Sequence, residues 1–240
     1  MLALLVLTTA KLITDQQARE AAALARRAAV AADQLASELT LRRRLLEAMA
    51  DSEVARAGEL EALHRFTTRV AASDELIRSI SLTDAQGRQL FNTAAAFGAP
   101  LPASQLRDLE RPLFDAGRPF VSPLVTGTVT GEPQVGIAVP LRDAGGVVRF
   151  SLRAALRPAA VSEVLIRQRW PDDWTASVID PSTGTPVILC RASRVLKVGC
   201  NWPSRTASPS PAPIAARSTI AFNARRFGPL GLKGTEGGSI

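Results

Sequence analysis

No set of side chains in this sequence has the spacing typical of a catalytic or metal-binding site. The single histidine, His64, has no suitable cysteine, aspartate or serine partner, and we expect it on the surface of a helix. Cys190 and Cys200 lack a CxxC spacing and a nearby histidine, although an oxidising compartment would allow them to pair. Nucleotide-binding and zinc-protease motifs are absent. The sequence therefore predicts no catalytic site, no metal and no cofactor.

Polar residues on expected strands and loops indicate a binding pocket for a small molecule instead. A structural role is the alternative for each of them, because a strand shifted by one residue exchanges its inner and outer faces. The segment from Gly127 to Gly131 is either an anion-binding loop or an ordinary turn. The candidate ligand-binding residues are Asn92, Thr93, Arg118, Ser122, Thr126 and Thr128, with Phe91 and Phe120 as apolar walls.

The elements that must position these residues follow from hydrophobic periodicity and turn residues. Strands are expected at 76–83, 89–93, 120–125, 134–141 and 147–156, where apolar and polar residues alternate. Between the second and third of these, Ser104 is expected to cap a helix over 105–116, which Gly117 ends. Pro112 predicts a kink or an early stop in that helix. The order predicts an α+β fold with a PAS-like antiparallel sheet and flanking helices.

A long helix is expected before the sheet. Residues 15–70 contain no proline and one glycine, and are rich in strong helix formers, which favours one helix or a helix with a single break. The basic residues 42–44 have acidic partners at Glu38 and Glu47, although a nucleic-acid patch is the alternative. An apolar stripe along the helix can pack on the domain or on a second copy of the chain. Its members are Leu24, Ala28, Ala31, Leu35, Leu39, Leu46 and Met49.

The first residues form an apolar run that is too short to span a bilayer, which takes about 20 residues. Three interpretations compete for residues 1–14: the end of a membrane helix, a signal segment, or the first turns of a soluble helix. We favour the remnant of a membrane helix.

The character of the sequence changes near residue 180. Eight of the 29 basic residues and one of the 22 acidic residues lie beyond Asp180, so the net charge of +7 comes from the C-terminal part. Residues 158–189 are expected to start a second PAS-like lobe, with a helix at 159–168, a strand at 174–180 and a turn at 181–184. Residues 190–240 are basic and Pro/Ser-rich and are expected to be disordered. The break near residue 184 suggests an out-of-frame tail; a genuine basic tail is the alternative.

Three stretches together resemble the double-Cache sensor domains found outside the membrane in bacterial histidine kinases, diguanylate cyclases and chemoreceptors. They are 81–102 (SLTDAQGRQLFNTAAAFGAPLP), 117–156 and 167–184 (RQRWPDDWTASVIDPSTG). The resemblance implies a membrane helix, a long stalk helix at 15–70, a ligand-binding membrane-distal lobe at 71–157 and a proximal lobe. Ser122-Pro123 departs from it, since relatives often carry an acidic residue after the serine.

The sequence as a whole predicts the extracytoplasmic sensing region of a bacterial inner-membrane receptor of the histidine kinase type, without its output domain. Its expected partners are an unidentified small molecule, the membrane through the N-terminal segment, and a second copy through the long helix. Two alternatives remain: a nucleic-acid-binding protein that uses the basic tail, and a structural dimerisation module that binds no ligand.

Overall fold

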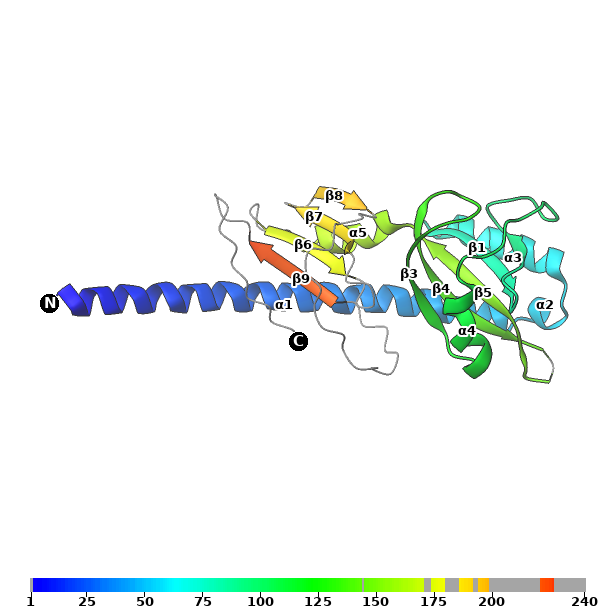
Figure 1. The fold of residues 1–240 in the computed structure, drawn as a ribbon, viewed down its shortest axis with the longest axis horizontal. Coiled ribbons are helices and arrows are strands. Elements are labelled where there is room, and N and C mark those ends of the chain that lie inside the picture. The colour runs from blue at the N-terminus through cyan, green and yellow to red at the C-terminus, as the bar shows by residue number, and fades with distance from the viewer. Residues whose placement is uncertain are drawn as a thin grey trace.

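A computed structural model describes residues 2–143, 145–170, 174–179, 186–191, 194–198 and 221–226 of the chain. A long helix runs beside two antiparallel sheets (Figure 1). The helices are α1 (Leu2–Ala50), α2 (Glu53–Arg56), α3 (Leu60–Ser73), α4 (Arg107–Ala116) and α5 (Pro158–Ile166). The strands are β1 (Ile77–Asp84), β2 (Gln89–Asn92), β3 (Phe120–Thr126), β4 (Pro133–Arg142), β5 (Val148–Leu156), β6 (Trp174–Ile179), β7 (Pro186–Arg191), β8 (Arg194–Val198) and β9 (Ala221–Arg226).

The first sheet has the strand order β2-β1-β5-β4-β3, and every neighbouring pair is antiparallel. All five strands lie where the sequence predicts them, within one or two residues at each end. This confirms the α+β fold with a long N-terminal helix and a PAS-like sheet. Strand β5 lies at the centre of the sheet and is hydrogen-bonded to β1 on one edge and to β4 on the other. Side chains on β5 are therefore held in fixed positions.

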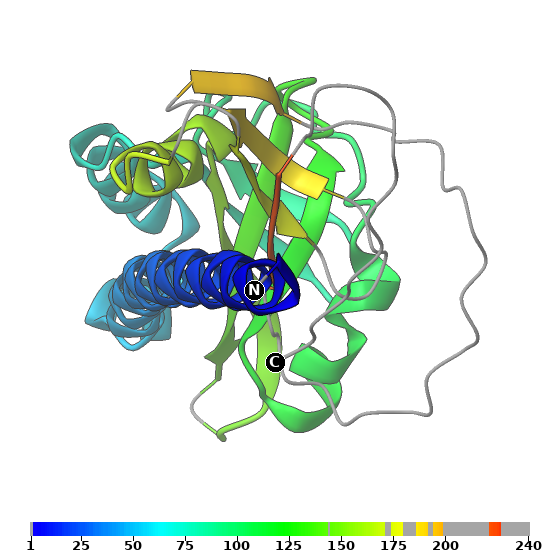
Figure 2. The same cartoon turned by 90° about the vertical axis from the view of Figure 1, so that its left-hand side faces the viewer.

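Helices cover both faces of this sheet. Seen along α1, the helices α1 and α3 lie on one side of the sheet and α4 lies on the other (Figure 2). The side facing α1 and α3 is apolar, because alternate residues of β1, β4 and β5 point into one core. Its most deeply buried members include Leu46, Leu63, Ile80, Leu82, Phe91, Ile137, Val139 and Leu152.

The apolar stripe of α1 packs on the protein's own lobes. Leu46 and Met49 join the core under the first sheet, whereas Ala31 and Leu35 contact α5 and β6 residues. The chain turns at residues 51–52 and again at 57–59, so the predicted long helix is divided into α1, α2 and α3. Ser52 causes the first of these turns by capping α2, with its hydroxyl accepting a hydrogen bond from the Ala55 N–H.

The second sheet has the order β8-β7-β6-β9. Its strands β8 and β9 lie within the segment that the sequence predicts to be disordered. Strand β9 aligns along the whole of β6, from Trp174 opposite Arg226 to Ile179 opposite Ala221. Most of the tail, the predicted turn at 181–184 and Cys200 lie outside the described residues.

The structure confirms the sequence-based prediction for Gly117 and differs from those for Pro112 and His64. Gly117 ends α4 in the left-handed conformation, at φ 61°, as predicted. Pro112 does not stop α4, which continues to Ala116. His64 is buried rather than on the surface, because its ring lies 5.4 Å from Phe91 and 5.6 Å from Phe97 and its Nε2 is 3.2 Å from the Ala95 carbonyl.

Candidate functional site

The face of the first sheet that lies under α4 is polar and buried. We call it the polar face. Strand register forms it: Arg153 of β5 lies opposite Ser81 of β1, which in turn lies opposite Asn92 of β2. The next row places Ser151 opposite Thr83. The buried polar residues of this face are Ser79, Ser81, Thr83, Asn92, Ser122, Gln134, Ser151 and Arg153.

Arg153 is the charged centre of the polar face. Its Nη1 lies 3.1 Å from Oε1 of Glu110 on α4 and donates to the Ser104 hydroxyl at 3.3 Å. Ser104 thus holds the arginine rather than capping α4, whose N-cap is Leu106. Gly136 of the neighbouring strand β4 makes room for the arginine stem, since a Cβ at that position would lie 3.0 Å from Cδ of Arg153.

The ion pair between Arg153 and Glu110 is almost fully removed from water. The exposed fraction is 7% for the Arg153 side chain and 1% for that of Glu110. Burial raises the pKa of the Glu110 carboxyl, and the nearby Arg153 charge only partly opposes this rise. Burial likewise lowers the pKa of Arg153, opposed by Glu110. Desolvation therefore outweighs attraction within the pair, which is a common outcome for buried ion pairs.

Several other polar atoms of the site are buried without a hydrogen-bond partner in the protein. The Ser151 hydroxyl lies near the Glu110 carboxyl and helps to hold down its pKa, but neither this hydroxyl nor Oε2 of Glu110 makes a hydrogen bond of normal geometry. Thr83 Oγ1 and Gln134 Oε1 are also without a partner. Buried polar groups are usually hydrogen-bonded. These four atoms could therefore bind the polar groups of a small molecule.

Gln89 joins the rim of the polar face to two loops. Its amide nitrogen donates to the Pro102 carbonyl at 2.7 Å and to the Thr128 hydroxyl at 3.1 Å, while its amide oxygen accepts from Asn92 at 3.0 Å. The loop that carries Thr128 also packs on Gln134, because a Cβ at Gly127 would lie 2.6 Å from Oε1 of that glutamine. The segment 127–131 is therefore a packed turn at the edge of the site.

The structure brings together some of the predicted ligand-binding residues. Asn92 and Thr128 meet at Gln89, and Ser122 accepts a hydrogen bond from the Gly136 N–H at 2.7 Å beside the Arg153 stem. Phe120 lies in the same row of the sheet as Arg153, through Ala138 of β4. These four predicted residues therefore belong to the polar face or its rim.

The other predicted residues lie elsewhere. Phe91 points into the apolar core on the opposite side of the sheet. Arg118 and Thr126 are exposed. The Thr93 hydroxyl accepts a hydrogen bond from the Ile80 N–H at 2.9 Å, which extends the pairing of β1 beyond the end of β2.

Sequence reasoning missed Arg153 and Glu110. A signal for Arg153 is present in the sequence, because Ser151 and Arg153 alternate with the apolar residues Leu152 and Ala154 in a strand with two covered faces. Glu110 gives no such signal, since an acidic residue in the first turn of a helix is common on protein surfaces.

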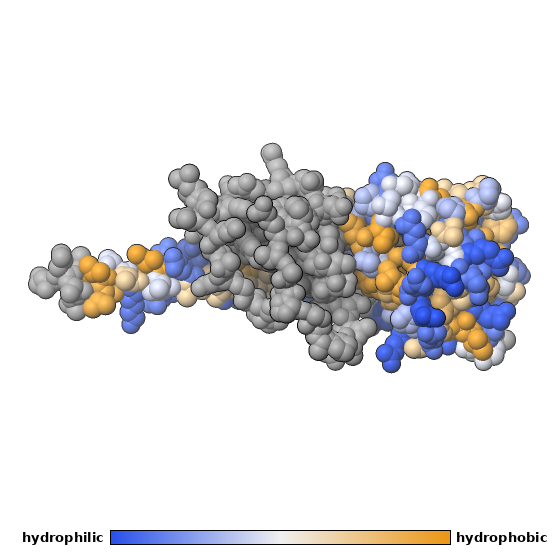
Figure 3. All heavy atoms as spheres, in the orientation of Figure 1, coloured by the Kyte–Doolittle hydropathy of each residue, from blue (hydrophilic) through white to orange (hydrophobic). Residues whose placement is uncertain are grey.

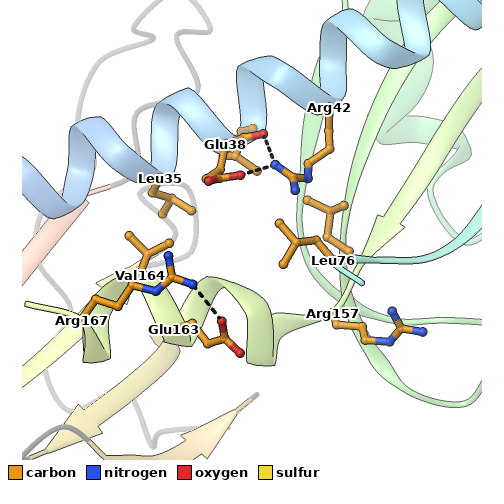
Figure 4. A pocket seen from close by; sticks show the side chains of 10 residues that line it. Leu35, Glu38, Arg42, Leu76, Arg157, Glu163, Val164 and Arg167 are labelled. Carbon is orange, nitrogen blue, oxygen red and sulfur yellow. Dashed lines mark hydrogen bonds and ion pairs between the residues drawn. The ribbon is translucent and has the colours of Figure 1, made fainter. Parts of the chain in front are cut away.

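A small cavity lies at the junction between α1, α5 and the first sheet. Its volume is about 60 Å³, enough for one or two water molecules rather than a metabolite. Figure 4 shows Glu38 bonded to Arg42 on α1 and Glu163 bonded to Arg167 on α5, with Arg157 pointing away from the cavity. The lining residues are Leu35, Glu38, Leu39, Arg42, Leu76, Leu156, Arg157, Glu163, Val164 and Arg167.

The described part of the chain contains neither a metal-binding cluster nor a membrane-spanning helix. No group of three or more histidine, cysteine, aspartate or glutamate side chains there could hold a metal ion. None of the helices in the same residues combines the length and apolar character that crossing a membrane requires.

No protein-family model matches the sequence, and no curated protein sequence matches it. Solved structures do match the fold. The ligand-binding domain of the amino acid chemoreceptor PctB of Pseudomonas aeruginosa PAO1, in complex with L-Gln, is 17% identical with a TM-score of 0.53, covering 65% of this chain and 63% of that chain. The corresponding domain of the Pseudomonas fluorescens chemoreceptor CtaA, in complex with L-isoleucine, is 19% identical with a TM-score of 0.51, covering 64% and 61%.

The sensor domain of the Vibrio cholerae histidine kinase DctB is 13% identical, with a TM-score of 0.46 and coverage of 66% of this chain and 64% of that chain. The chain thus spans less than two thirds of each of these three domains. At these identities the likeness concerns the fold. The long helix and the antiparallel sheet of this chain therefore form the fold that is seen in the ligand-binding domains of bacterial chemoreceptors.

Proposed function

We propose that this chain is a small-molecule-sensing module and that its ligand binds on the polar face, beneath α4. One observation carries the proposal: Arg153 and Glu110 are buried together on a sheet face where further polar atoms have no partner in the protein. A face that served stability alone would gain more from apolar side chains. The role that we propose for this arrangement is binding rather than catalysis.

The fold supports the cellular setting of the proposal. We place the module outside the cytoplasm in a bacterial transmembrane receptor of the chemoreceptor or histidine kinase type. Residues 71–157 form the membrane-distal lobe in this proposal, and residues 158–189 belong to the proximal lobe.

The start of α1 supports an orientation toward a membrane. The exposed fractions are 59% for Val6, 67% for Leu7, 67% for Leu12 and 58% for Ile13. Figure 3 shows hydrophobic surface along the protruding end of the molecule. Because the apolar stripe of α1 is already buried within the chain, a homodimer would form through another face of α1.

The proposal is tested by thermal unfolding of the purified chain in the presence of small metabolites. A ligand at 100 times its Kd adds about 2.7 kcal/mol to the free energy of unfolding, a readily measured shift in Tm. We expect Arg153→Met to abolish this shift. Arg149→Met is the matched control, because Arg149 lies on the same strand and its side chain is 63% exposed. A ligand that stabilises the Arg153→Met variant equally would place binding elsewhere.

A further inference from the structure

The helix that covers the polar face buries only part of its surface. Glu110 and Leu113 are its two buried residues, Phe114 is half-buried, and the other side chains of α4 are exposed. No side chain caps its N-terminus, and Pro112 removes one backbone hydrogen bond from within it. The contact between Glu110 and Arg153 is the polar contact among the few buried ones that hold α4 on the sheet.

The two partners of this contact differ in how firmly they are placed. Arg153 is fixed by a central strand that pairs on both sides, and its stem lies against Gly136. Glu110 belongs to a surface helix that has no side-chain cap and contains a proline. If α4 lifts, the guanidinium of Arg153 stays on the sheet while the carboxylate leaves and regains its hydration.

Glu110 does not make the strongest contact that a carboxylate can make with Arg153. Arginine binds carboxylates most strongly through two parallel N–H to oxygen hydrogen bonds. Glu110 uses one oxygen, at 3.1 Å from Nη1, and its Oε2 has no hydrogen-bond partner. A small carboxylate that is not tethered to a helix is free to adopt the two-bond geometry, and the hydroxyls of Ser151 and Thr83 lie on the same face.

We infer that Glu110 is a built-in competitor for the ligand: it occupies Arg153 when no ligand is present, and a small carboxylate displaces it and thereby releases α4. This inference rests on the proposed function and adds to it a ligand class, the small carboxylates, and a switch. The switch has two states that differ in the partner of one arginine, so the ligand shifts the equilibrium through its preference for the open state.

Acetate is the probe for this inference because it reproduces the end of the Glu110 side chain, and acetamide is its neutral match. Binding of each to the intact chain is measured at constant ionic strength by NMR titration. We expect Glu110→Gln to bind acetate roughly tenfold more tightly than the wild type, because a neutral amide competes less well for Arg153. Acetamide should gain nothing, and Arg153→Met should not bind acetate.

Hydrogen exchange gives the second readout. In the wild type, acetate should speed exchange in residues 107–116 and leave β5 unchanged, because α4 leaves the sheet while Arg153 stays. Slower exchange in α4 would overturn the release, and equal acetate affinity of the wild type and Glu110→Gln would overturn the competition. If either occurs while a neutral metabolite stabilises the wild type, the proposed function stands and this inference fails. If no ligand of any kind binds, both fail.

Discussion

At the scale of single residues, the buried pair of Arg153 and Glu110 is expected to affect stability, and in our proposal it also controls binding. Burial shifts the pKa of each group in the direction of the uncharged form, so each side chain depends on the other to remain charged. Removing one partner is consequently more harmful than removing both, because it leaves one buried charge without compensation.

Arg153→Met is expected to lower the free energy of unfolding by roughly 3–5 kcal/mol at neutral pH. The loss should be smaller in mildly acidic solution, where Glu110 binds a proton and no buried charge remains. Urea unfolding at both pH values measures this difference. As a control, Arg153→Met combined with Glu110→Leu should recover most of the lost stability. A loss that is the same at both pH values would mean that packing of the arginine stem, rather than its charge, dominates.

The raised pKa of Glu110 also predicts a pH dependence of stability. Because the folded-state pKa lies above the ordinary value of 4.5, the folded protein binds this proton more tightly than the unfolded chain does. The stabilisation is fully present below the unfolded-state pKa and is lost as the pH rises through the folded-state pKa. As the pH rises from the unfolded-state to the folded-state pKa of Glu110, we therefore expect the wild type to lose stability relative to Glu110→Gln. Urea unfolding of both proteins at a series of pH values measures this difference. The same pH dependence of stability in the two proteins would contradict the raised pKa.

At the scale of elements, α1 has two faces with different roles. The buried stripe contacts both sheets and α5, whereas Leu41 and the apolar residues near the N-terminus are exposed. The charged residues 42–43 are paired, with Arg42 bonded to Glu38 and 3.2 Å from Asp74, and Arg43 2.8 Å from Glu47. The basic run on α1 thus stabilises the helix and its contact with the first sheet.

Replacing a leucine of α1 with alanine is expected to lower stability strongly on the buried face and only slightly on the exposed face. Leu46→Ala should lower the free energy of unfolding by about 2–5 kcal/mol, because Leu46 is fully buried at 0% exposure in the core of the first sheet. Leu41→Ala, on the same helix, should change it by less than about 0.5 kcal/mol, because Leu41 is 62% exposed. Chemical unfolding of both variants measures the two effects. A large effect at Leu41 would indicate that this face is covered in solution, for example by a second copy.

At the scale of the whole molecule, the chain contains separate cores along one helix. The core of the first sheet includes Leu46 and Ile80, and a smaller core beside the second sheet joins Leu35, Leu165 and Val178. Leu39 packs against both. Because separate cores can open independently, the two parts of the molecule are expected to differ in local stability.

Leu165→Ala tests this separation. Leu165 is completely buried in the smaller core, so its truncation leaves a cavity there. We expect faster hydrogen exchange in β6 and α5, with exchange in β1 and β5 unchanged. A uniform increase throughout the chain would show that the two cores unfold as one unit.

Local features of the sequence determined the elements of this protein. The alternation in 76–83 and 147–156, the apolar stripe of α1 and the glycine at 117 each act over a few residues, so their effect can be predicted without knowing the fold. The same local reasoning placed Asn92, Ser122 and Thr128 near the candidate site, because polar residues at strand ends and turns tend to border such sites.

Only the tertiary structure decided which side chains meet. Glu110 and Arg153 are 43 residues apart, and their contact depends on strand register and on the face of the sheet that α4 covers. Neighbours along a strand point to opposite faces, but only the fold shows that Phe91 rather than Asn92 faces the apolar core. His64 is buried by phenylalanines from another segment. The strand β9 pairs with the edge of β6 that β7 leaves open, and the two strands are far apart in the sequence. Such contacts between distant segments arise from packing and pairing in three dimensions, which local periodicity does not encode.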